Sequence, residues 1–131
     1  MTRTVMEMIG EARSLVGAVA PADAAKELAA GTAVVIDVRQ SDEWQHGHID
    51  GSVPTPRGLL EFIADPTSPR HKEALDPATR TIVVCASGAR AALAAATLKT
   101  MGYDDVAVLE GGLKAWIDAG LPTCEHEYAG I

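Results

Sequence analysis

Hydrophobic positions form two kinds of pattern along this chain: short continuous apolar runs and longer segments with helical spacing. Three short runs are predominantly apolar: 33–39, 81–84 and 105–109. Continuous apolarity of this length is typical of strands buried on both faces of a parallel sheet. A further short strand is expected near Val53, and helical patterns occupy the segments 20–31, 40–44, 59–65, 90–101 and 111–122. Strands that alternate with helices predict an α/β fold with a mostly parallel sheet.

The N-terminal residues show a separate helical pattern. Apolar side chains recur every three or four positions: Val5, Met8, Ile9, Ala12, Leu15 or Val16, and Val19. This spacing predicts an amphipathic helix. We expect the helix to pack on the flank of the domain, and a contact between two copies of the chain is the alternative.

Length and composition fit one domain. The chain has 131 residues, of which 47% are apolar and 4% aromatic, so one core packed mainly by aliphatic side chains is expected. No repeat or change of composition divides the chain. We therefore expect an N-terminal amphipathic helix at 1–18, a domain at 19–123 and a C-terminal tail at 124–131.

Charge and cysteine content narrow the classes of partner. A net charge of −7 argues against nucleic acid, because phosphate backbones bind to basic faces. No apolar run approaches the length of a membrane span. Glu7, Glu11 and Arg13 interrupt every apolar core that a signal peptide would need. Cys85 and Cys124 are widely separated and indicate no disulfide framework, so we expect a cytoplasmic protein.

Cys85 lies at the end of a predicted strand. The run Thr81–Val84 leads directly to this thiol, the following "ASGA" has no bulky side chain, and Arg90 opens an alanine-rich helix. Unpaired amides and the helix dipole both favour an anion at a helix start, and parallel sheets bind ligands at the carboxyl ends of their strands. The combination predicts a reactive cysteine in an anion-binding loop. A buried structural cysteine is the alternative.

Three stretches of the sequence, in this order, resemble the rhodanese family of sulfurtransferases. They are "VVIDVRQSDEWQHGHIDGSV", the loop "CASGAR" and "LKTMGYDDVAVLEGGLKAWIDAGLP". The similarity covers about residues 19–123, and its specificity comes from the order and spacing of the pieces. The resemblance implies a rhodanese-like fold, with a central, mostly parallel five-stranded sheet and helices on both faces.

The resemblance also implies a chemistry for Cys85. The thiol would take the sulfane sulfur of thiosulfate or a persulfide, carry it as a persulfide and pass it to cyanide or to a thiol, which includes the thiol of a protein acceptor. This covalent catalysis needs no metal and no coenzyme. A monomer or homodimer is expected. The residues expected to hold the sulfur or the donor are Ala86, Ser87, Gly88, Ala89 and Arg90, with Arg57 of "PTPRG" at the rim.

Two other functions are consistent with the sequence. One is an interaction or sulfur-relay module with little turnover of its own, against which the intact cysteine argues. The other is a phosphatase or arsenate reductase, but those related enzymes use Cys-x5-Arg and this loop is Cys-x4-Arg. The shorter loop favours sulfur over a tetrahedral oxyanion. Because the loop carries no basic residue before Arg90, a persulfide or polysulfide donor competes with thiosulfate.

The other polar residues are assigned structural roles. We interpret Asp37 and Arg39 as a hydrogen-bonded pair beside the site, since charges buried there are usually paired. Glu43 and Trp44 are assigned to the scaffold. The segment 110–112 is expected to pack near the loop, and Trp116 is expected in the core.

Two short pairs of metal-ligating residue types stand far apart in the sequence. His46 and His48 form a His-x-His, and Cys124 and His126 form a Cys-x-His. Each pair alone provides too few ligands, so no metal site is expected. A tail cysteine without a function is the preferred interpretation of Cys124, and a thiol that resolves an oxidised Cys85 is the alternative.

Overall fold

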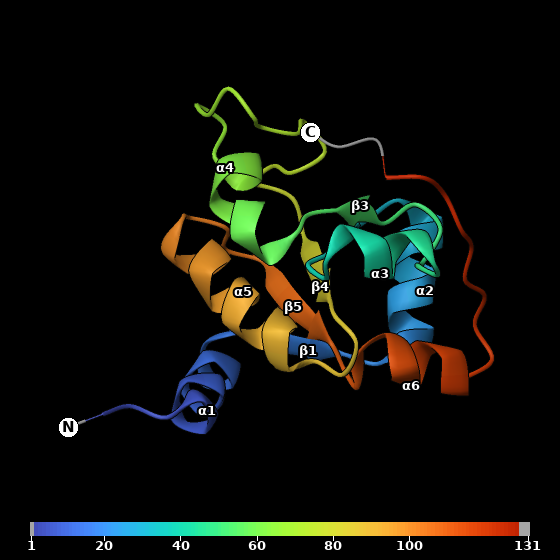
Figure 1. Ribbon diagram of the computed structural model, residues 1–131, viewed down its shortest axis with the longest axis horizontal. Coiled ribbons are helices and arrows are strands. Elements are labelled where there is room, and N and C mark those ends of the chain that lie inside the picture. Colours follow the sequence, from blue (N-terminus) through green and yellow to red (C-terminus); the bar gives the residue numbers. More distant parts are fainter. Residues whose placement is uncertain (1, 129–131) are drawn as a thin grey trace.

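Five strands form one sheet at the centre of the molecule (Figure 1). The computed structural model describes residues 2–128. Its strands are β1 Gly17–Val19, β2 Val34–Asp37, β3 Val53–Pro54, β4 Thr81–Val84 and β5 Val106–Leu109. They lie in the order β1-β5-β4-β2-β3, and every pairing is parallel. The predicted α/β class and the five-stranded, mostly parallel sheet are confirmed.

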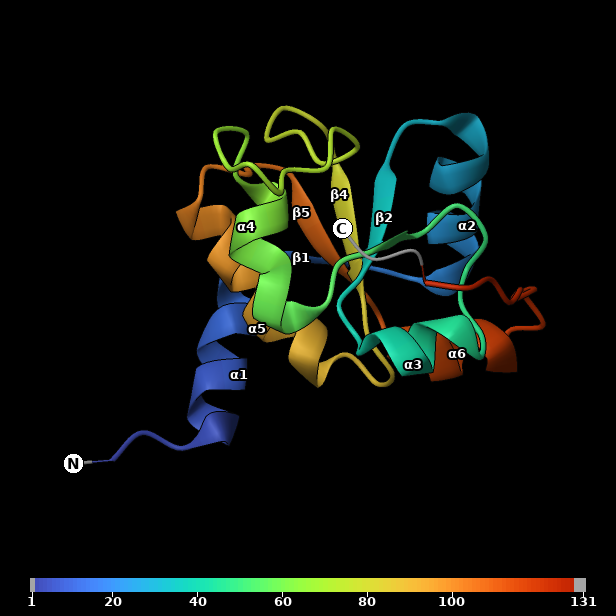
Figure 2. The same cartoon turned by 45° about the horizontal axis from the view of Figure 1, so that its top comes forward.

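Helices cover both faces of this sheet. They are α1 Val5–Leu15, α2 Pro21–Ala30, α3 Ser41–Gln45, α4 Leu60–Ala64, α5 Ala89–Thr100 and α6 Gly112–Asp118, with a 3-10 turn η1 Arg57–Leu59. Figure 2 shows α1, α4 and α5 on one side of the sheet and α2, α3 and α6 on the other. Within residues 2–128 no helix has the length and apolarity needed to cross a membrane.

Alternate residues of the central strands supply two apolar cores. Val83 and Cys85 face the core beneath α1, α4 and α5, whereas Ile82 and Val84 face the core beneath α2 and α6. This alternation follows from the pleat of a strand. The helix α5 presents four fully buried alanines to the first core: Ala91, Ala92, Ala94 and Ala95. Trp116 is buried in the second core, as predicted.

The N-terminal helix is shorter than the apolar pattern suggested. It starts at a capping box of Thr4 and Glu7 and ends at Leu15, and Val19 belongs to the edge strand β1. The helical assignment of Val19 is therefore wrong. Gly17 favours the break, because glycine is a poor helix former. Ile9 and Ala12 are buried against the first core, which confirms the packing of this helix on the flank of the domain.

The sheet brings the ends of several strands to one edge. Val19 pairs with Leu109, and Asp37 pairs with Val84, so the loops after β1, β5, β4 and β2 open side by side. Cys85 is the first residue beyond β4. The topology therefore places the thiol at the carboxyl edge, where parallel sheets bind their ligands.

The last described residues return to the body of the protein. His48 and Cys124 form an isolated antiparallel bridge, in which each backbone amide donates to the carbonyl of the other residue at 3.0 and 2.9 Å. The beginning of the predicted tail is thus anchored beside the loop that follows α3.

Candidate active site

The Cys85 thiol is enclosed by backbone amides. The amide of Gly88 donates to Sγ at 3.0 Å and the amide of Ala91 donates at 3.3 Å. The side chain is only 1% exposed. Gly88 is the N-cap of α5 and Ala91 lies in its first turn, so one donor comes from the loop and the other from the helix start. Donors in this position stabilise negative charge on the sulfur.

The loop needs glycine at Gly88. This residue has a φ of 112°, a region that L side chains adopt only with strain. The conformation turns the Gly88 amide toward Sγ and starts α5 immediately afterwards. Within "ASGA" the Gly88 amide donates to the sulfur, and a role of Ala86, Ser87 and Ala89 in holding the sulfur or the donor stays a prediction.

The start of α6 fixes the same loop from the other side. The amides of Leu113 and Lys114 donate to the carbonyls of Cys85 and Ala86 at 2.9 and 3.1 Å. Gly112 lies so close that a Cβ there would be 2.5 Å from the Ala86 carbonyl oxygen. The expectation that 110–112 packs near the loop is confirmed.

Asp37 and Arg39 form a buried ion pair beside these loops. The Arg39 Nη2 donates to Asp37 Oδ2 at 2.8 Å and to the Gly47 carbonyl at 2.7 Å. Both side chains are less than a tenth exposed. The pair has the hydrogen bonds that buried charges require, which agrees with the structural interpretation from the sequence.

The comparisons with known proteins identify the family of the chain. A sequence model of the rhodanese-like domain matches residues 20–119. The chain belongs to the rhodanese family. It is 34% identical over 103 residues to thiosulfate sulfurtransferase 18 of Arabidopsis thaliana, covering 70% of this chain and 72% of that protein. Several other curated relatives are longer, and the chain spans 19% to 40% of the length of three of them.

Two solved structures share the fold over almost the whole chain. A protein from Rhodopseudomonas palustris, whose description reads "possible tyrosine phosphatase", superimposes with a TM-score of 0.85 at 40% identity, covering 93% of this chain and 95% of that one. The polysulfide-sulfur transferase homodimer of Wolinella succinogenes gives a TM-score of 0.72 at 31% identity, covering 94% and 88%.

In this rhodanese domain, Arg90 is paired with Glu43. Its two terminal nitrogens donate to the two Glu43 oxygens at 2.8 and 3.0 Å. The Glu43 carboxylate raises the pKa of Arg90, and the hydrogen bond from Arg90 lowers the pKa of Glu43. The positive charge of Arg90, which was expected to attract a donor, is therefore partly neutralised. Glu43, which was assigned from the sequence only to the scaffold, contacts Arg90 at the end of the loop.

We expect Glu43→Gln to reduce stability slightly at neutral pH. The folded-state pKa of Glu43 lies below its ordinary value of 4.5, so its contribution is present above that value and is lost as the pH falls through the lowered pKa. Because the pair is partly exposed, the loss at pH 7 is about 0.5 kcal/mol. Urea unfolding at several pH values measures it, with exposed Glu73→Gln as control. A difference between wild type and variant that does not shrink as the pH falls progressively below 4.5 would contradict the assignment.

Arg57, in η1, contacts α5 at a distance from the active-site loop. Its guanidinium donates to Glu61 at 3.0 Å and to the Thr97 hydroxyl at 3.3 Å, and Thr97 is two turns into the helix. It lines a groove between α1 and α5 together with Ala12 and Leu15. A contact between Arg57 and the donor stays a prediction.

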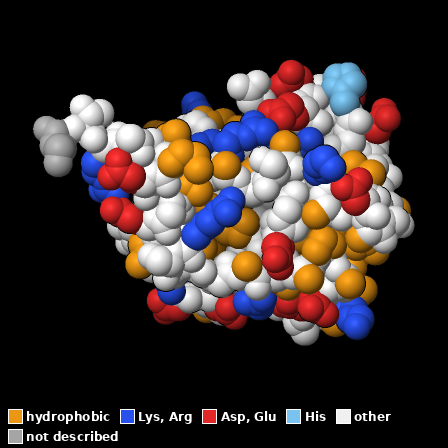
Figure 3. All heavy atoms as spheres, turned by 90° about the horizontal axis from the view of Figure 1, so that it is seen from below, with side chains coloured by type: hydrophobic (Ala, Val, Ile, Leu, Met, Phe, Trp, Pro, Cys, Tyr) orange, Lys and Arg blue, Asp and Glu red, His pale blue; other side chains and the backbone are white. Residues whose placement is uncertain are grey.

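A different arginine reaches the active-site loop. Arg13, from the last turn of α1, lines a cavity of about 210 Å³ together with Ser87, Gly88, Glu110 and Gly111. A Cβ on Gly88 would lie 3.8 Å from Arg13 Nη2. Figure 3 shows Lys and Arg side chains interspersed with Asp and Glu side chains on the face seen from below. No motif in the sequence pointed to Arg13, because only the fold places α1 beside this loop.

Proposed function

We propose that this rhodanese domain is a sulfurtransferase in which Cys85 carries the transferred sulfur. The observation that supports the proposal most strongly is the pair of amides that donate to a buried Sγ at the end of β4. Relatives named for thiosulfate and polysulfide sulfur transfer point to the same class of reaction. The cytoplasmic location and the monomer or homodimer remain predictions from the sequence.

The proposed reaction has two steps at one sulfur. The Cys85 thiolate attacks the outer sulfur of thiosulfate, the sulfur–sulfur bond of the donor breaks, and sulfite leaves with its electron pair. The acceptor then attacks the outer sulfur of the Cys85 persulfide. The Cys85 thiolate leaves and is regenerated, and the product is thiocyanate when the acceptor is cyanide or a new persulfide when it is a thiol. A persulfide donor follows the same path with a thiolate as leaving group. No net oxidation and no further reactant are needed.

We propose Arg13 as the residue that recognises an anionic donor. It is positioned by α1 at the cavity beside Ser87 and Gly88, whereas Arg90 is occupied by Glu43. The cavity also contains Glu110, which opposes a dianion. One arginine against one glutamate favours a donor of low charge, so an alkyl persulfide or polysulfide is preferred over thiosulfate.

Replacing Arg13 by alanine tests this assignment. Because a charge-assisted contact to a donor is worth about 1–2 kcal/mol, KM for thiosulfate should rise about 5- to 20-fold with little change in kcat. KM for a persulfide whose alkyl group carries no charge should change less. Arg3→Ala removes a charge from the same terminal segment, where Arg3 is paired with Glu11, and serves as the control. Equal effects of both variants, or equal effects on both donors, would exclude a specific role of Arg13.

A phosphatase is the second function to test, because a relative with 40% identity is described as a possible tyrosine phosphatase. The loop from Cys85 to Arg90 is one residue shorter than Cys-x5-Arg, and Arg90 is paired with Glu43 rather than directed to the sulfur. We expect thiosulfate or persulfide to be consumed and a generic aryl phosphate to be left intact. Hydrolysis of the aryl phosphate at a rate above that of sulfur transfer would reverse this order.

A sulfur-relay role differs from free-standing turnover only in the acceptor. Because Cys85 is only 1% exposed, we propose that an acceptor approaches the sulfur from the side of the cavity that Ser87 and Gly88 line. A protein thiol on an extended segment and a small thiol both satisfy this condition. Comparing the rates with which the two discharge sulfur-loaded protein separates the relay from the small-molecule enzyme.

A further inference from the structure

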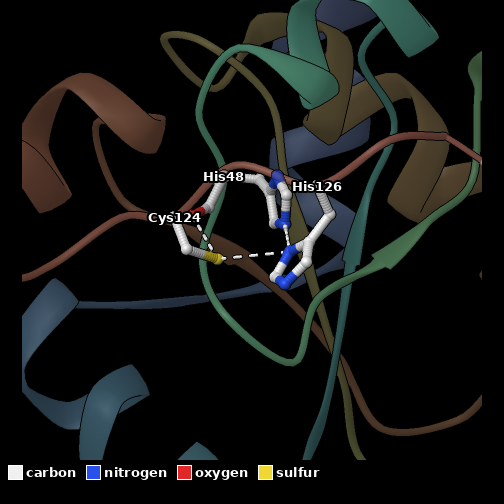
Figure 4. A group of neighbouring side chains, drawn as sticks. All are labelled: His48, Cys124 and His126. Carbon is white, nitrogen blue, oxygen red and sulfur yellow. Dashed lines mark hydrogen bonds between the residues drawn. The ribbon is translucent and has the colours of Figure 1, made fainter.

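Three metal-ligating side chains, all far from Cys85 in the sequence, lie close together in the structure. They are His48, after α3, and Cys124 and His126 of the returning tail (Figure 4). One ligand atom from each lies within 4.8 Å of the other two. The His-x-His and Cys-x-His pairs were each short of ligands in the sequence, and the fold combines one histidine of the first with both residues of the second.

The distances among these atoms match those around a small cation. His48 Nε2 lies 3.0 Å from His126 Nδ1, and Cys124 Sγ lies 3.6 Å from the same nitrogen. A tetrahedral zinc ion, with bonds of about 2.1 Å to nitrogen and 2.3 Å to sulfur, holds its ligand atoms about 3.4–3.6 Å apart. Two of the three separations thus lie within a few tenths of an ångström of those in a coordination triangle, and the third, between Cys124 and His48, is within 4.8 Å.

The surroundings of His48 prepare it as a ligand. Its Nδ1 lies 2.6 Å from the Trp44 carbonyl oxygen, which accepts the ring proton and leaves Nε2 with a lone pair directed at the cluster. The ring stacks on Trp44, with centroids 3.6 Å apart and planes inclined by 8°. Metal-bound histidines are oriented in this way by a hydrogen bond from the second ring nitrogen.

The backbone and nearby charges support the same interpretation. The bridge between His48 and Cys124 fixes the separation of their side chains through two backbone hydrogen bonds. Asp50 lies beside the Cys124 thiol, and Glu125 and Glu127 line the groove next to His126. These carboxylates create a negative potential that favours a cation.

We infer that His48, Cys124 and His126 form a binding site for one zinc ion, independent of the sulfur chemistry at Cys85. Nitrogen and sulfur donors suit zinc, whereas calcium and magnesium prefer oxygen. Zinc replaces the proton of the Cys124 thiol, which passes to solvent, and the Nδ1 proton of His126 moves to Nε2. Three protein ligands leave the fourth position to water. The bound ion fastens the tail to the loop after α3.

Titration of the chelator-treated full chain tests the site. Cobalt, used as a spectroscopic substitute for zinc, should bind one equivalent and give a thiolate-to-cobalt absorption band, which zinc then removes. Excess zinc should raise the midpoint of thermal unfolding by about 5–10 °C, the effect expected of a ligand at about 100 times its Kd.

Cys124 and His126 are not buried, so both can be replaced without changing the packed core. Cys124→Ser and His126→Ala should each weaken zinc binding by at least about 100-fold and remove the thermal shift. His71→Ala is the matched control, because its Nδ1 also lies near a backbone carbonyl, that of Ile63 at 2.9 Å, outside the cluster. Cys85→Ser should retain the band.

Two results would overturn the site. One is the absence of one-to-one binding, which would leave the three side chains as a hydrogen-bonded network only. The other is a band that survives in Cys124→Ser and disappears in Cys85→Ser, which would place the ion at the other cysteine.

Discussion

Replacing Cys85 by serine is expected to abolish sulfur transfer and to leave the domain folded. Serine fills nearly the same volume in a position that is 1% exposed, and its hydroxyl still accepts hydrogen bonds from the amides of Gly88 and Ala91. It does not form a persulfide, however, so the covalent intermediate is lost. The rate of thiocyanate formation from thiosulfate and cyanide should fall by at least about 1000-fold.

The fold of the variant has to be measured in parallel. Circular dichroism and the midpoint of thermal unfolding should stay close to those of the wild type, since the substitution removes no apolar contact larger than one sulfur atom. Cys85→Ala provides a second variant without any nucleophile. Turnover by either folded variant above a tenth of the wild-type rate would exclude Cys85 as the carrier.

Replacing Gly112 by alanine is expected to damage the active site without touching Cys85. Gly112 has a φ of 67°, and an added Cβ would meet the Ala86 carbonyl oxygen at 2.5 Å and the Ser87 nitrogen at 2.7 Å. Strain at positive φ and overpacking should together cost about 2–4 kcal/mol of stability. Displacement of the loop should lower kcat about 100-fold, because the amides no longer converge on the sulfur.

Gly120 offers a matched control for this substitution. Its φ of 79° is similar, but a Cβ there would have nothing within 4 Å. Gly120→Ala should therefore lose only the conformational part, about 1 kcal/mol, and retain activity. Urea unfolding and sulfur-transfer rates for both variants separate the two contributions. If Gly112→Ala is as stable and as active as Gly120→Ala, the close contact does not define the loop.

Much of the fold could be predicted because its central strands are continuously apolar. The runs that became β2, β4 and β5 are buried on both faces, so their pattern is clear in the sequence. The three residues of β1 are too few to show a period of two, and they continued the apparent spacing of α1. Local patterns identify long buried elements better than short edge strands.

The candidate active site could likewise be predicted only in part. Cys85 and its loop are contiguous in sequence, so a strand end, a glycine and a helix start were enough to single them out as candidates. Arg13 comes from α1, and the partner of Arg90 comes from α3. The cluster of His48, Cys124 and His126 joins residues 78 positions apart. These contacts depend on how the elements pack, which a period or a motif does not encode.

The most direct test of the account is the intact mass of the protein after exposure to a donor. Wild-type protein is incubated separately with thiosulfate and with a low-molecular-weight persulfide, then with cyanide, and Cys85→Ser is treated identically. We predict a gain of one sulfur atom on the wild type only, its removal by cyanide, and more complete loading by the persulfide. A wild-type protein that gains no sulfur from either donor, or a serine variant that gains as much, would contradict the assignment of Cys85 as a sulfur carrier.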